Sequence, residues 1–96
     1  MQQEQGMVRG LGKTFAGSIA GKEIVNIDGT VLGELEDFVF DLQTGTLIDM
    51  VAKPNSGLDR QKYREDGKFV LIPFSSVVAI KDFIVVDESR ATKKQT

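Results

Sequence analysis

The chain has 96 residues, of which 41% are hydrophobic, and this is enough material for one small core but not for two. Its 12 basic and 14 acidic side chains give a formal net charge of -2, so the strong positive field that holds nucleic-acid phosphates is missing. Cysteine and histidine are both absent, which excludes disulfides, thiolate nucleophiles, the usual zinc sites and imidazole acid–base catalysis. We therefore expect one domain that is not an enzyme, needs no cofactor or metal, and makes no direct contact with nucleic acid.

Three segments of the chain differ in composition. Residues 1–18 are rich in Gln and Gly and show no sustained periodicity, which predicts a flexible N-terminal arm. Residues 19–87 contain short β-branched and aromatic runs and form the predicted domain, and residues 88–96 form a flexible C-terminal tail. No apolar run approaches the roughly 20 residues of a membrane span, and the first residues lack the features of a signal peptide. We expect a cytoplasmic protein without a transmembrane segment, in which residues 1–14 and 89–96 are dispensable for folding.

The first predicted element of the domain is a β-hairpin. Residues 24–27 form its first strand, and Asp28-Gly29 is a dipeptide suited to the positive φ angles of a tight turn. The turn leads into a long second strand over residues 31–41, in which Gly33 permits a bend or close packing. This pattern is strong evidence for a hairpin.

A second turn extends the hairpin into a three-stranded meander. Asp41 can accept backbone N–H bonds, and Gly45 can adopt the left-handed conformation that the turn needs. The third strand follows over residues 47–53. A polar stretch then runs from Pro54 to Lys68 and is expected to hold a single helical turn, capped by Ser56 or Asp59.

Three more short strands complete the predicted domain. Residues 69–72 form a fourth strand, which ends at Pro73 because proline lacks the donor for the next ladder bond. A short helical turn separates it from strands over residues 77–80 and 83–86. Six short strands with little helix favour an all-β barrel or a sandwich-like roll, since closure protects the edges of so small a sheet.

The strand over residues 31–41 has apolar side chains on both faces. By strict alternation, Phe38 and Phe40 lie on one face of the strand, while Leu35 and Val39 lie on the other. One explanation is a β-bulge near Asp37 that swaps the faces. The other is that Phe38 or Phe40 is covered by a second subunit.

The predicted core comes from the apolar positions of the strand runs. A six-stranded barrel of this length encloses little volume, so the remaining large apolar side chains cannot all lie inside it, and those left outside form a surface for partners. The expected core members are Ile24, Leu32, Leu35, Val39, Leu47, Met50, Val70, Ile72, Val77, Ile80, Ile84 and Val86.

Two patterns resemble catalytic or phosphate-binding motifs without meeting their requirements. Residues 12–14 read Gly-Lys-Thr, like the end of a phosphate-binding loop, but Met7 stands where that motif needs glycine. Glu34 and Glu36 share one face of a strand, where a solvated surface explains them better than a pair of catalytic acids. We therefore predict no catalytic, cofactor-binding or metal-binding residue.

Several different short motifs follow one another along residues 18–87. They are Gly21-Lys22-Glu23-Ile24-Val25, the run from Gly29 to Asp37, Asp41 with Thr44-Gly45, and Leu71-Ile72-Pro73-Phe74 followed by Val77. This ordered set resembles the PRC-barrel family, the small β-barrel of the photosynthetic reaction-centre H subunit and of the C-terminal part of the ribosome maturation factor RimM. The resemblance implies a small six-stranded PRC-type barrel, with structural turns at Asp28, Gly29, Gly33, Asp37, Asp41, Gly45 and Pro73.

The sequence is most similar to the stand-alone archaeal members of that family, which are linked to FtsZ-based cell division. The resemblance implies a non-enzymatic adaptor that binds the membrane anchor SepF, related PRC-barrel proteins, or both, and that a partner recruits to the division site. The alternative is a RimM-like factor that binds a ribosomal protein during small-subunit maturation or acts in RNA metabolism.

We also expect a homodimer or a hetero-oligomer. Aromatic side chains are the favoured anchors of such contacts, because they bury large areas at low entropic cost. Tyr63, the only tyrosine, fits equally well as an anchor on a partner and as a lid over the barrel end. The expected interface residues are Phe38, Phe40, Tyr63, Phe74 and Phe83.

Overall fold

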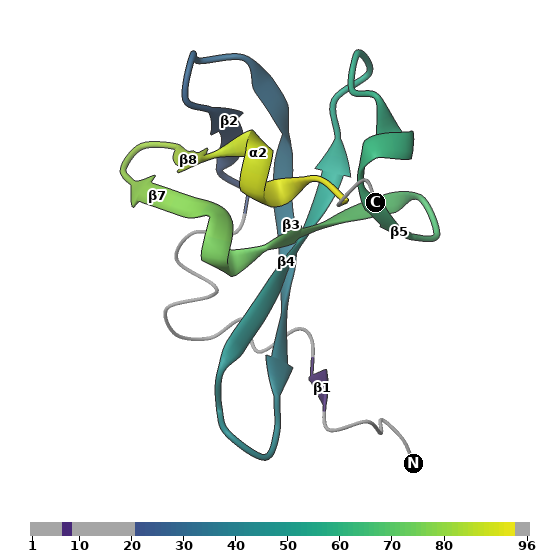
Figure 1. The fold of residues 1–96 in the computed structure, drawn as a ribbon, viewed down its shortest axis with the longest axis vertical. Coiled ribbons are helices and arrows are strands. Elements are labelled where there is room, and N and C mark those ends of the chain that lie inside the picture. Colours follow the sequence, from purple (N-terminus) through teal and green to yellow (C-terminus); the bar gives the residue numbers. More distant parts are fainter. Residues whose placement is uncertain (1–6, 9–20, 94–96) are drawn as a thin grey trace.

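The computed structural model describes residues 7–8 and 21–93 (Figure 1). Short helical segments connect or follow the strands. They are η1 (Arg60–Lys62), η2 (Phe74–Ser76) and α2 (Glu88–Ala91). The strands are β1 (Met7–Val8), β2 (Glu23–Asn26), β3 (Val31–Asp41), β4 (Leu47–Pro54), β5 (Arg64–Asp66), β6 (Phe69–Pro73), β7 (Val77–Ile80) and β8 (Ile84–Val86).

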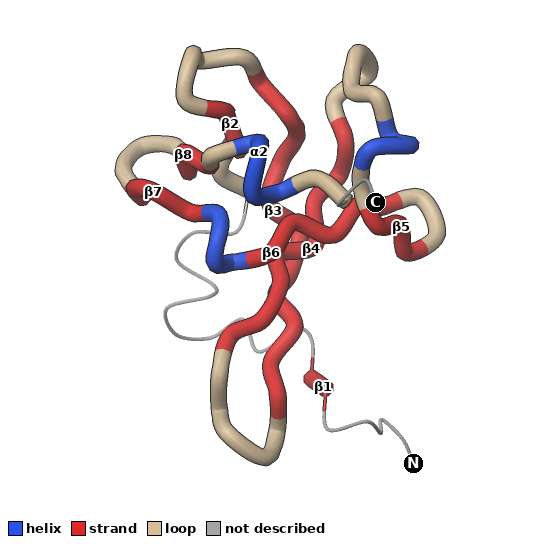
Figure 2. Tube along the Cα trace, in the orientation of Figure 1, coloured by secondary structure: helices blue, strands red, loops and turns tan. Residues whose placement is uncertain are grey.

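The strands form one strongly bent sheet in the order β5-β6-β4-β3-β2-β8-β7, and β1 pairs with β3 beside this path. Neighbouring strands are antiparallel except β2 and β8, which are parallel. Figure 2 shows the β3–β4 hairpin projecting beyond the other strands, with β1 alongside it. Within the described residues, β5 and β7 are not paired with each other, so the sheet of this all-β fold stays open.

All six predicted strands are present. The predicted meander is confirmed as β2-β3-β4, and the predicted helical turn is η1, where the Asp59 carboxylate accepts from the backbone N–H of Gln61. The strand β5 was not predicted, because its three residues are all charged and exposed. The expected closure is wrong for the described residues, and this leaves two edges of the sheet to be accounted for.

The long strand β3 contains the bulge that one explanation of its pattern required. Leu35 pairs with Ala52 and Asp37 pairs with Val51, so one residue of β3 is unmatched between these pairs. Because the extra residue shifts the alternation by one, Leu35 and Phe38 both lie in the core, each 1% exposed. The side chain of Phe38 is therefore covered by its own chain.

The core lies inside the bend of the sheet. Nine of the twelve expected core residues are buried, and Leu47, Val77 and Ile80 are partly buried and pack against them. Other buried apolar residues were not predicted. They are Val25, Phe38, Val51, Ala52, Tyr63 and Ala91.

The turns form as their residues predict. Asp28 accepts hydrogen bonds from the backbone N–H and the hydroxyl of Thr30, and these bonds lower the pKa of its carboxyl group. Gly29 has a φ of 92°, in the region that other residues rarely adopt. In the second turn, Asp41 accepts the N–H of Gln43, and Gly45 has a φ of 74°.

Gly33 is needed for close packing. A Cβ atom at this position would overlap the carbonyl oxygen of Lys53 on the neighbouring strand β4. Close packing was one of the two roles expected for Gly33 from the sequence, the other being a bend.

The predicted domain boundary at residue 87 is wrong. Residues 88–91 form α2, whose N-terminus is capped by the carboxylate of Asp87 and whose Ala91 is 4% exposed. The backbone N–H of Lys93 donates to the carbonyl of Lys62, at 2.7 Å. The packed domain therefore continues to at least residue 93. Of the predicted N-terminal arm, only residues 7–8 are described, and they pair with Phe40 and Asp41 of β3.

Candidate protein-interaction surface

Large apolar side chains are exposed at two ends of the molecule. Val78 of β7 is 56% exposed and Phe83, in the turn before β8, is 42% exposed. Ile27 lies in the turn after β2, and Leu42 lies at the tip of the β3–β4 hairpin. Because β2, β8 and β7 are consecutive in the sheet, Val78 and Phe83 belong to one end of it.

The two edges of the sheet differ in chemistry. Strand β5 has the sequence Arg-Glu-Asp, and its charged side chains protect the edge against pairing with another strand. Strand β7 has the sequence Val-Val-Ala-Ile and carries no charge. Figure 1 shows β7 at the margin of the molecule, joined to β8 by a short turn. The β7–β8 hairpin, residues 77–86, thus has an uncharged edge strand, and its charged residues, Lys81 and Asp82, lie in the turn.

The five residues expected at an interface do not lie together. Phe38 and Tyr63 are each 1% exposed and belong to the core, so both are wrong as surface anchors of this folded chain. Phe40 and Phe74 are half-buried and pack against the core. Phe83 alone among the five is an exposed side chain.

Tyr63 is covered by its own chain and is held by a hydrogen bond. Its hydroxyl donates to Oε2 of Glu88 in α2 at 2.6 Å, and Oε1 of Glu88 accepts from Asn26 Nδ2 at 3.0 Å. Burial, and then the hydrogen bond to Glu88, raise the pKa of Tyr63 far above its ordinary value. These contacts join the loop after η1, the end of β2 and α2.

Titration of this single tyrosine should be linked to unfolding. The unfolded chain ionises near pH 10, whereas the folded chain keeps the hydroxyl protonated at that pH, so stability is present below pH 10 and falls as the pH rises above it. We expect phenolate absorbance to appear only together with loss of the β-sheet circular dichroism signal. Tyr63→Phe should reduce stability at pH 7 by about 1.5 kcal/mol, because a hydrogen bond to a carboxylate is lost. Phenolate that forms near pH 10 in the folded protein would contradict this account.

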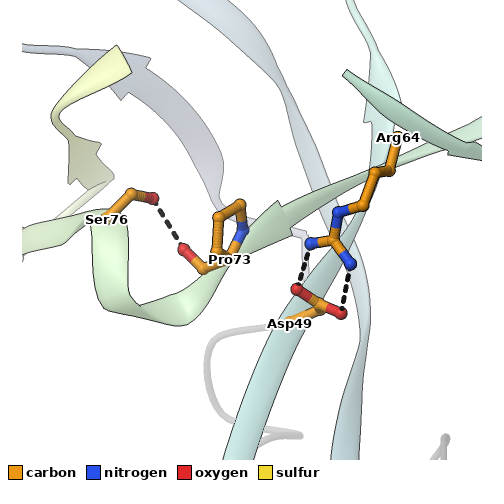
Figure 3. Close-up of polar contacts among 4 residues, drawn as sticks. All are labelled: Asp49, Arg64, Pro73 and Ser76. Atoms are coloured by element: carbon orange, nitrogen blue, oxygen red, sulfur yellow. Dashed lines mark hydrogen bonds and ion pairs between the residues drawn. The ribbon is translucent and has the colours of Figure 1, made fainter. Parts of the chain in front are cut away.

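A second polar contact joins a residue of β5 to a buried residue of β4. The side chain of Asp49 in β4 is 4% exposed, and its two carboxylate oxygens accept from the two terminal nitrogens of Arg64 (Figure 3). Asp49 lies opposite Pro73, which has no N–H. The nearby Ser76 hydroxyl is fully buried and donates to the Pro73 carbonyl at 2.6 Å. Both contacts satisfy polar groups within the fold.

An open groove lies between β2, β3 and β4. It has a volume of about 500 Å³ and is lined by Glu23, Glu34 and Lys53 over Gly33. In the part of the chain that the structure describes, no three acidic side chains come close enough to hold a metal ion. Among the same residues, no helix is long and apolar enough to cross a membrane.

The fold is a small all-β domain with an uncharged edge strand. The chain belongs to the PRC-barrel domain family, whose model matches residues 6–93. The match extends past both predicted domain boundaries, residues 18 and 87, and includes β1 and α2. The chain is also 38% identical, over 72 residues, to an uncharacterized protein of Methanocaldococcus jannaschii. The aligned region covers 75% of this chain and 79% of that protein.

Proposed function

We propose that this PRC-barrel protein is a non-enzymatic adaptor of the archaeal cell-division machinery based on FtsZ and SepF. Its partners are the membrane anchor SepF and related PRC-barrel proteins, and SepF brings it to the division site. Membership of the family and the similarity to an archaeal protein support this proposal.

The observation that carries the proposal is the uncharged edge strand β7 with the exposed Phe83 ring beside it. Monomeric proteins rarely leave an uncharged edge strand and a neighbouring aromatic side chain in contact with water. Phe83 projects from the turn between the two strands, where the backbone N–H of Lys81 donates to the Phe83 carbonyl at 2.8 Å. A partner with an apolar pocket would bury the ring at little entropic cost, because the turn already holds the backbone of Phe83.

The test is a quantitative pull-down of the tagged full chain from native cells. The wild-type chain should retain SepF and other division proteins, and Phe83→Glu should reduce their recovery at least about tenfold, as expected for loss of a central anchor. Leu42→Glu is the matched control, because Leu42 is 59% exposed but lies at the tip of the β3–β4 hairpin. It should retain the partners at the wild-type level.

The identity of the retained proteins decides between the two functions that the family offers. Recovery of ribosomal proteins in place of division proteins would overturn the proposal in favour of a RimM-like role. Equal losses for Phe83→Glu and Leu42→Glu would instead show that the β7–β8 hairpin is not the binding surface.

A further inference from the structure

A short C-terminal segment joins the two ends of the open sheet. The path of the sheet ends at β5 on one side and at β7 on the other. Residues 87–93 run from the end of β8, across the opening, to the residues before β5 (Figure 1). The backbone N–H of Asp87 donates to the Ser76 carbonyl at 2.8 Å, and that of Lys93 donates to the Lys62 carbonyl at 2.7 Å. We call residues 87–93 the strap, because they bridge a gap that no strand pairing closes among the described residues.

One carboxylate fastens the strap to both sides of this gap. Oε2 of Glu88 accepts the Tyr63 hydroxyl next to η1, and Oε1 accepts from Asn26 Nδ2 at the end of β2. The amide of Asn26 is oriented for this contact, because its oxygen already accepts the backbone N–H groups of Asp28 and Thr30. Both oxygens of Glu88 are therefore held by groups whose own positions the fold fixes.

The strap is also part of the core. Ala91 is 4% exposed and belongs to the same buried cluster as Tyr63, and α2 contacts η2 and β6. Opening the strap would leave a cavity in place of Ala91 and would remove the acceptor of the Tyr63 hydroxyl. A helix of four residues is not stable by itself, so α2 in turn depends on these contacts. The strap and the sheet thus stabilise each other.

We infer that the strap closes this open sheet, that Glu88 is the latch that fastens it, and that the strap and the sheet open as one cooperative unit. This conformational device goes beyond the proposed function and does not depend on which partner the chain binds. It replaces the expectation from the sequence that residues 89–96 are dispensable for folding, because Ala91 and Lys93 lie within the strap. Its tests use the purified chain alone, so their outcome is independent of the pull-down.

Urea denaturation of the full chain, followed by two signals, tests the cooperativity. Tyr63 is the only tyrosine and the chain has no tryptophan, so tyrosine fluorescence reports the surroundings of the latch. Far-ultraviolet circular dichroism reports the sheet. The two transitions should have the same midpoint. A change in fluorescence at a lower urea concentration than the loss of the sheet signal would show that the strap opens by itself, and would overturn the inference.

Glu88→Ala tests the latch. This variant should raise the equilibrium constant for unfolding at least about tenfold, because two hydrogen bonds to a carboxylate are lost. Arg90→Ala is the matched control, since Arg90 is an exposed residue of the same helix, and it should change the constant less than about threefold. Equal effects of the two substitutions would contradict a special role for Glu88.

A double-mutant cycle separates the latch from the stability of α2 itself. Tyr63→Phe removes the hydrogen bond to Glu88 from the wild-type chain, but in the Glu88→Ala chain this bond is already lost. The effect of Tyr63→Phe on the free energy of unfolding should therefore fall to less than about a third of its wild-type size. Additive effects would mean that Glu88 stabilises the helix without holding Tyr63, and would overturn its assignment as the latch.

Discussion

Phe38→Glu should abolish folding of the domain. The ring is 1% exposed and belongs to the core, with its centroid 6.2 Å from that of Phe40. Removing a buried aromatic ring costs about 3–5 kcal/mol, and burying a carboxylate without a partner adds several more. A domain of this size is stable by about 5–15 kcal/mol, so little or no folded protein should remain. Circular dichroism and thermal melting check this result.

The matched control is Phe83→Glu, the same change at an exposed ring. Because Phe83 is 42% exposed, this variant should melt within a few degrees of the wild type. If Phe38→Glu folds normally and instead loses self-association, then Phe38 is an interface residue, and its assignment to the core through the bulge in β3 is wrong.

Arg64→Ala should destabilise the domain by about 3 kcal/mol. The substitution leaves the Asp49 carboxylate buried in β4 without its cation, and breaking a buried ion pair is costly for this reason. The figure lies at the low end of the usual range, because the Arg64 side chain is 48% exposed and water can partly replace it. Urea denaturation at neutral pH measures the change in the free energy of unfolding.

Two further variants separate the buried carboxylate from the loss of a surface arginine. Arg60→Ala removes the half-exposed ion pair with Glu65, whose Nε–Oε2 distance is 3.4 Å, and should cost less than about 1 kcal/mol. Adding Asp49→Asn to Arg64→Ala removes the unpaired charge and should restore part of the lost stability. Equal costs for Arg64→Ala and Arg60→Ala would contradict a special role for Asp49.

The strand content of the fold could be predicted because turn residues and β-branched runs act locally. Asp28-Gly29 and Gly45 require particular backbone angles whatever surrounds them, and the structure has those angles. Strand β5 was missed although Asp66-Gly67 is itself a strong turn signal, and Gly67 has a φ of 61°. The turn signal was sufficient to predict a hairpin here, because an edge strand needs no apolar residues.

The burial of Phe38 and Tyr63 could not be predicted in the same way. The position of a bulge depends on how two strands pair, and a one-residue shift reverses every side chain beyond it. The burial of Tyr63 depends on α2, which lies 25 residues away along the chain and was assigned to a flexible tail. A signal for α2 is nonetheless present in Asp87, whose carboxylate caps the helix as Asp59 caps η1.

The most direct test of the adaptor role is isothermal titration calorimetry of the purified full chain with purified SepF. The proposed function predicts saturable binding that Phe83→Glu weakens at least about tenfold and that Leu42→Glu leaves intact. Absence of binding to SepF at roughly 100 micromolar, by a wild-type chain that is folded, would contradict the account.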